Sequence, residues 1–254
     1  MTTGEGFDCI EAPQDELETH SLPNAIRIIS SRVAKIFSDT VNLSLRTEHE
    51  VELGSELQMQ VQQNIQQAMQ VKARIEQWTR GLITTSKPRT VCTGNNQKLI
   101  VAPTRVLGIM WMTHATMLMI LSKSILHCCR AAEKLQLQTS DTLPNGVESV
   151  EHIASVAKDQ ILQSIKWICR SIPYNMGEVD EQGKVLSIPR YKASSAYYLS
   201  WPLALLFFSA STTSAQLRLC NQTIEKIRSV YGIQLVHVVV AMTKEECRRV
   251  YQGE

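Results

Sequence analysis

A histidine followed directly by two cysteines could carry nucleophilic chemistry in this chain. His127, Cys128 and Cys129 are the residue types of a general base and a thiol nucleophile. Consecutive residues of a helix point about 100° apart, so this order does not aim the imidazole at either thiol. His114 precedes them in the same apolar region, at a spacing that does not suit an i, i+4 metal pair. We expect both histidines to be hydrogen-bonded core residues.

Three acidic residues close together could supply a general acid and a general base. Glu178, Asp180 and Glu181 lie in a polar stretch that contains glycine, and acids in such loops are normally solvated. No Gly-x-Ser-x-Gly turn, Walker loop, dinucleotide fingerprint or His-Glu-x-x-His motif occurs. The sequence therefore predicts no catalytic, cofactor-binding or metal-binding residue, and a protein that is not an enzyme.

The cysteines indicate neither a disulfide framework nor a zinc site. There are seven of them, odd in number and widely spaced, and no Cys-x-x-Cys pair occurs. Most are expected to be small buried residues in a reducing compartment. They are Cys9, Cys92, Cys128, Cys129, Cys169, Cys220 and Cys247.

Composition and charge are those of an ordinary globular protein. Of 254 residues, 44% are hydrophobic and 20% are charged, and the formal net charge is +2. No long run of Lys and Arg occurs, which argues against direct binding of DNA. Residues 1–20 are polar and acidic, so we expect a flexible lead, and they lack the charged and apolar regions of a secretory signal.

Apolar residues recur at helical spacing over most of the remaining chain. Pro23 fits the first turn of the first helix, and Gly81 is a suitable stop for the second. No strand-like alternation persists along the chain. We predict an all-α, single-domain bundle of about seven to eight helices over residues 21–254, with a loop at residues 82–97. The expected helices span about 21–45, 50–80, 104–137, 147–171, 193–210, 213–231 and 233–251.

The segment Val106–Ile120 is strongly apolar and needs to be tested as a membrane span. It falls short of the roughly 20 apolar residues that cross a bilayer, and it contains His114. A helix that is apolar almost all round belongs in the middle of a bundle. We therefore expect a buried core helix here and no membrane association.

Three short motifs mark the second half of the chain. Pro173, in Ser-Ile-Pro-Tyr, biases Ile172 away from helix, so the preceding helix is predicted to end there. Pro202, in Trp-Pro-Leu, is predicted to start or bend an apolar helix while Trp201 fills the core. Gly232, in Tyr-Gly-Ile, is predicted to allow a left-handed turn between two helices.

The order of these motifs resembles the C-terminal regulatory domain of fungal six-cysteine zinc-cluster transcription factors. In that family the segments read ICxSVPxxxG, xxLLWPLxxA and RRWIxxxLxxIGxxxGIxQA, and the sharp part of the match lies at about residues 165–240. The run NAIRIISSRVAKIFSDTVNL also resembles the first helix of the family, where Arg32 is expected to have a structural role. The family's DNA-reading zinc cluster has no counterpart in residues 1–50, which hold only Cys9.

The resemblance implies a transcription-regulator-like protein of a filamentous fungus, located in the nucleus or alternatively the cytoplasm. It would control a secondary-metabolite gene cluster through a co-regulator partner or a small-molecule effector, without reading DNA directly. One alternative is a helical small-molecule-binding protein recruited to a biosynthetic pathway, and another is a truncated relic without function. The small-molecule alternative depends on a set of Met and aromatic residues, Met110, Trp111, Met117, Met119, Trp201, Phe207 and Phe208.

Overall fold

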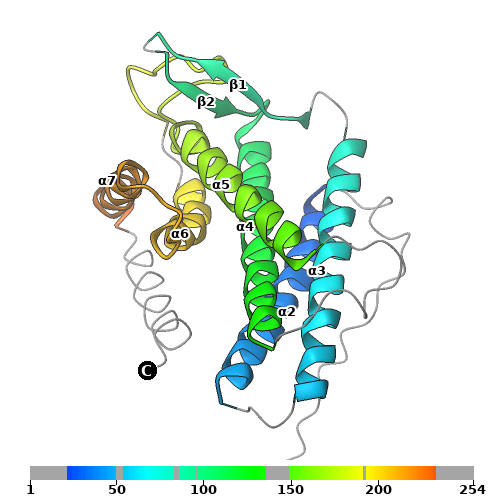
Figure 1. Cartoon of the computed structure of the whole chain (residues 1–254). Coiled ribbons are helices and arrows are strands. Elements are labelled where there is room, and N and C mark those ends of the chain that lie inside the picture. Colours follow the sequence, from blue (N-terminus) through cyan, green and yellow to red (C-terminus); the bar gives the residue numbers. More distant parts are fainter. Residues whose placement is uncertain are drawn as a thin grey trace, which may run out of the picture.

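The computed structural model describes residues 22–49, 54–82, 86–94, 96–135, 149–190 and 193–232, which are mostly helical (Figure 1). The all-α expectation holds in its main feature. Six helices and one two-stranded sheet lie within these ranges, and the predicted helix at 233–251 and the lead at 1–20 fall outside them. The elements are α2 Leu22–His49, α3 Gly54–Gly81, β1 Arg89–Cys92, β2 Lys98–Val101, α4 Arg105–Lys134, α5 Val150–Asn175, α6 Ala193–Phe207 and α7 Ser214–Tyr231.

Helix α4 lies at the centre of the described structure because it is apolar on nearly every side. It packs against α2, α3, α5 and α6, and Figure 1 shows it running through the middle of the molecule. Among the described residues, α4 is the one helix whose length and composition would suffice to cross a membrane. Its burial by four neighbouring helices accounts for that composition, as expected for a central core helix.

Helices α2 and α3 cover one side of α4 and run in opposite directions. The Ser30 hydroxyl donates to Met117 Sδ at 3.0 Å, and Thr40 Oγ1 lies 3.8 Å from Cys128 Sγ. Residue numbers therefore rise together along α2 and α4, which are parallel. Helix α3 returns antiparallel, because its start, at Leu57, shares a core cluster with Cys128, whereas its end lies beside His114.

The prediction that no strands occur, with a loop over residues 82–97, is wrong. Strands β1 and β2 form an antiparallel hairpin in which Arg89 is paired with Val101 and Cys92 with Lys98. The turn is closed by the Asn96 N–H, which donates to the Thr93 carbonyl at 2.9 Å, and Asn96 has a positive φ of 59°. Strands of four residues are too short to show a clear alternation of apolar and polar residues. The Gly-Asn-Asn sequence between them is the turn signal that indicates a hairpin.

The prediction that Pro173 ends its helix is also wrong. Helix α5 continues through Pro173 because Ile172 and Tyr174, on either side of it, are both buried. The helix ends instead at Asn175 and is capped by Met176, and Gly177 follows with a φ of +75°. The Glu178 N–H donates to the Pro173 carbonyl at 2.9 Å and the Gly177 N–H to the Tyr174 carbonyl at 3.0 Å, which is the Schellman arrangement.

Helix α7 begins and ends as its sequence predicts. Thr213 and Gln216 form a reciprocal capping box at its start. Gly232 follows its last residue with a φ of +65°, so the left-handed turn expected there is confirmed.

Substitution of Gly177 by alanine is expected to lower the free energy of unfolding by about 1–3 kcal/mol. The added Cβ would meet the Arg190 carbonyl oxygen at a left-handed backbone position. Denaturant unfolding followed by circular dichroism measures the change. Gly94→Ala is the matched control, since a Cβ there meets nothing within 4 Å, and equal stability of the two variants would contradict the prediction.

Candidate functional site

The three motifs of the second half of the chain meet in one core. The end of α5, the inner face of α6 and the inner face of α7 share a single cluster of buried side chains. Its members from these helices include Ile165, Ile168, Cys169 and Ile172 of α5, Ala196, Leu199, Leu203 and Leu206 of α6, and Cys220, Ile224 and Ile227 of α7. The motifs are therefore structural elements of one assembly.

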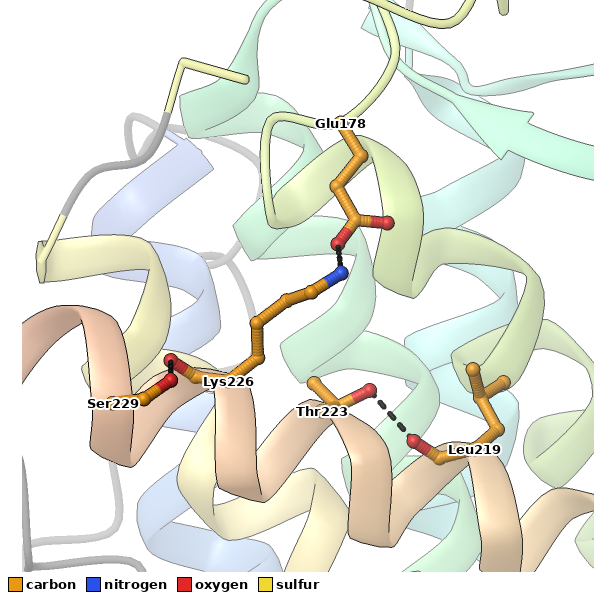
Figure 2. Close-up of polar contacts among 5 residues, drawn as sticks. All are labelled: Glu178, Leu219, Thr223, Lys226 and Ser229. Carbon is orange, nitrogen blue, oxygen red and sulfur yellow. Dashed lines mark hydrogen bonds and ion pairs between the residues drawn. The ribbon is translucent and has the colours of Figure 1, made fainter. Parts of the chain in front are cut away.

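An ion pair connects the end of α5 to α7 outside this core. Figure 2 shows Lys226 reaching from α7 to Glu178, with 2.5 Å between Nζ and Oε1. Beside it, the Thr223 hydroxyl donates to the Leu219 carbonyl at 2.8 Å, so Thr223 satisfies its polar group within its own helix. The pair is partly exposed, so its role is to orient the loop after α5 and its contribution to stability is small.

Helix α6 has an aromatic outer face, where the prediction that Trp201 fills the core is wrong. The helix starts at Ala193, passes through Pro202, and buries Pro202 while leaving Trp201 48% exposed. Tyr197 and Tyr198 are 56% and 51% exposed, and their rings meet edge to face with centroids 5.6 Å apart. We call Tyr197, Tyr198 and Trp201 the α6 aromatic face.

The spacing of the residues on α6 explains the two faces. Ala196, Leu199, Leu203 and Leu206 recur at helical intervals and are fully buried. Tyr197 and Trp201 stand four residues apart and share the opposite side, so this i, i+4 pattern was the signal that could have located the face in the sequence. Exposed aromatic residues that lie together are typical of protein contact sites, where Trp and Tyr supply much of the binding free energy.

His114 is a hydrogen-bonded core residue, as predicted. Its Nε2 lies 3.1 Å from Thr79 Oγ1, and the Thr79 hydroxyl donates its proton to the Ile75 carbonyl at 2.7 Å. The imidazole therefore donates through Nε2–H. Trp111 contacts the ring edge to face at 5.2 Å between centroids, and burial lowers the pKa of His114 to about 4.

The structure does not bring His127, Cys128 and Cys129 together as a base and a nucleophile. Burial, with Arg130 and Lys123 nearby, lowers the pKa of His127 to about 4. Burial also raises the pKa of Cys128 to about 11 and that of Cys129 to about 12. Both thiols stay protonated at neutral pH, which is the opposite of what a cysteine nucleophile needs.

The other described cysteines are also thiols. Cys92 is exposed on β1, whereas Cys169 of α5 and Cys220 of α7 are buried against each other. The hydrogen bond between these two thiols lowers the pKa of Cys169, and the same bond together with burial raises the pKa of Cys220. Cys9 and Cys247 lie outside the described residues.

The three loop acids have separate structural roles and form no acid–base pair. Glu178 is paired with Lys226, while Asp180 Oδ1 accepts the N–H groups of Gln182 and Lys184 at 2.9 and 2.8 Å. The main-chain carbonyl of Glu181 accepts from Arg89. Within the described ranges, no group of three His, Cys, Asp or Glu residues could hold a metal ion.

The Met and aromatic residues of the small-molecule alternative do not converge on one place. Met117 packs in the cluster shared with α2 and α3, whereas Met119 packs in the cluster shared with α5 and α6. Trp111 donates its indole N–H to the Ser86 carbonyl at 2.8 Å, and Trp201 faces outward. This distribution is that of ordinary core and surface residues.

Protonation of His114 alone is expected to lower the free energy of unfolding by about 1–2 kcal/mol between pH 7 and pH 5. The pKa of about 4 in the folded state lies below the ordinary histidine value of 6.5, so the unfolded chain takes up the proton first as the pH falls. The contribution of His114 is therefore full above about pH 6.5 and is lost as the pH falls towards 4.

Denaturant unfolding at several pH values measures this effect. His114→Gln should flatten the pH dependence by about half, because burial lowers the pKa of His127 in the same way. Thr79→Ser keeps the hydroxyl acceptor and serves as the control, which should retain the wild-type slope. An unchanged slope in His114→Gln would contradict the assignment.

Comparison of this chain with protein-family models, with characterised proteins and with solved structures finds no match.

Proposed function

We propose that this chain is a transcription-regulator-like protein of a filamentous fungus that acts by contacting a co-regulator protein. Its targets would be genes of a secondary-metabolite cluster, and its place of action the nucleus. The proposal is supported by the resemblance of the Ser-Ile-Pro-Tyr, Trp-Pro-Leu and Tyr-Gly-Ile segments, in that order, to the regulatory domain of fungal zinc-cluster transcription factors.

The α6 aromatic face is the observation that carries the proposal. Two tyrosines and a tryptophan are exposed on a helix whose opposite side is fully buried. Such residues are rigid and combine a large apolar surface with a polar atom, so they lose little conformational entropy on binding and suit protein interfaces. A regulator that acts through a co-regulator needs such a surface to bind it.

The chemistry of the described residues supports a binding role over a catalytic one. Titratable groups with clearly shifted pKa values, among them His114, Cys128 and Cys129, are buried, and burial favours their neutral forms. Residues 1–50 contain one cysteine, Cys9, whereas the zinc cluster of the family needs six cysteines. We propose that the partner recognises the DNA.

Deletion of the gene and transcript profiling test the proposal. Loss should change the transcripts of a discrete set of co-located genes, and a chain carrying Tyr197→Ala and Trp201→Ala should fail to restore them. The double variant should keep its fold, since both side chains are exposed and surface substitutions cost about 0.5 kcal/mol or less.

Met59→Ala is the matched control, because Met59 is an exposed apolar residue on α3. It should restore the transcripts as the wild type does. Two results would reject the proposal: a deletion strain with an unchanged transcript profile, or full restoration by the double variant.

A further inference from the structure

The end of the molecule near the β-hairpin carries an exposed surface of basic and aliphatic residues. Three segments meet there: the hairpin, the first turn of α4, and the loop after α5 (Figure 1). Arg89 Nη2 donates to the Glu181 carbonyl at 2.9 Å, and Arg105 Nη1 donates to the Arg190 carbonyl. We call this the hairpin-end surface; its residues are the half-buried Lys87 and Arg105 and the exposed Arg89, Lys98, Val106, Lys184, Val185, Ile188 and Arg190.

Positive charge predominates on the hairpin-end surface. Residues 86–105 and 176–190 together contain six Lys and Arg against three carboxylates. Of these carboxylates, Glu178 is paired with Lys226 of α7. Arg89 and Arg105 each donate to a neutral carbonyl oxygen, which leaves the charge of each guanidinium in place. The surface is therefore electrostatically suited to a ligand with several negative charges.

Aliphatic residues lie among these cations. Val106, Val185 and Ile188 are 66%, 69% and 81% exposed, and each is next to or near a basic residue in the chain. Binding of single-stranded nucleic acid depends on exposed aromatic rings for stacking, whereas these side chains are aliphatic. Cations mixed with aliphatic groups suit a peptide that carries both carboxylates and apolar side chains.

Helix α2 starts close to this surface. The contacts of Ser30 with Met117 and of Thr40 with Cys128 show that α2 and α4 run in parallel and in step. Counting back from Ser30 places Leu22 level with the first turns of α4, about 12 Å along the axis from Ser30. The chain that precedes Leu22 therefore joins the described structure at the hairpin end.

The sequence of residues 1–20 has the composition that the hairpin-end surface requires. It contains six Asp and Glu and no Lys or Arg, and Phe7, Ile10 and Leu17 are distributed among the acids. Twenty residues can extend about 60 Å, which is more than the roughly 45 Å length of α4. Residues 1–20 are therefore long enough to reach every part of the hairpin-end surface. Attachment nearby also gives the segment a high effective concentration at this surface.

We propose that residues 1–20 bind the hairpin-end surface of the same molecule and cover it. The interaction is between acidic and basic side chains and is supplemented by apolar contacts from Phe7, Ile10 or Leu17. It lies apart from the α6 aromatic face and does not depend on the function proposed above. A partner with an acidic peptide would have to displace this segment first.

Two natural cysteines allow the proposal to be tested in the full chain. Cys9 lies in the acidic segment, and Cys92 is exposed on β1, where it pairs with Lys98. A short bismaleimide applied to Cys247→Ser protein should join Cys9 to Cys92 within one chain, as read by peptide mass spectrometry. The yield should fall in 0.5 M salt, where the screening length is about 4 Å.

Charge variants give the decisive comparison. The triple variant Lys98→Glu, Lys184→Glu and Arg190→Glu should lower the yield roughly fivefold or more. Combining it with Asp15→Lys, Glu16→Lys and Glu18→Lys should restore the yield, because the charges are then exchanged. The control Arg130→Glu, Lys134→Glu and Lys158→Glu makes the same change in charge on exposed residues at the other end of α4 and should leave the yield unchanged.

Three results would overturn the proposal. One is a crosslink found only between two chains, which would indicate a dimer contact. Another is a yield that does not respond to salt or to the hairpin-end variant. The third is an equal loss in the hairpin-end and control variants, which would indicate a general effect of net charge. Circular dichroism of each variant confirms that its helical content is kept.

Discussion

The fold depends on the need to cover α4 on every side. This helix is apolar almost all round, so no single layer of neighbours can remove it from water. Helices α2 and α3 cover one side, α5 and α6 cover the other, and the β-hairpin lies near its first turn. The polar atoms of α4 are accommodated within this arrangement, as His114 shows by donating to Thr79. The positions of α2, α3, α5 and α6 are therefore set by their packing against α4.

The sequence predicted the features that arise from local patterns and missed those set by distant contacts. Periodicity located the six described helices, and Gly232 located the left-handed turn after α7. Pro173 was misjudged because burial on both sides of it outweighs the local bias of the residue before proline. The hairpin was missed because its strands are short, and β2 is stabilised by packing on α5, which is remote in sequence.

The candidate site was predictable in position but not in orientation. The Trp-Pro-Leu motif drew attention to α6, yet aromatic residues in an apolar helix do not reveal which side faces inward. The side is set by which residues reach the core of α5 and α7, and Leu199, Leu203 and Leu206 occupy it. Trp201 is consequently left outside. Similarly, the pairing of Glu178 with Lys226 of α7 could not be foreseen from the sequence.

The shared core of α5, α6 and α7 makes the three motif segments energetically interdependent. Ile168, Leu203 and Ile227 are fully buried in one cluster although the chain separates them widely. Substitutions at such neighbours do not add, since a cavity made at one position changes the cost of a change at the next. The three segments therefore form a single unit of mutational coupling, in which volume lost on one helix can be recovered on another.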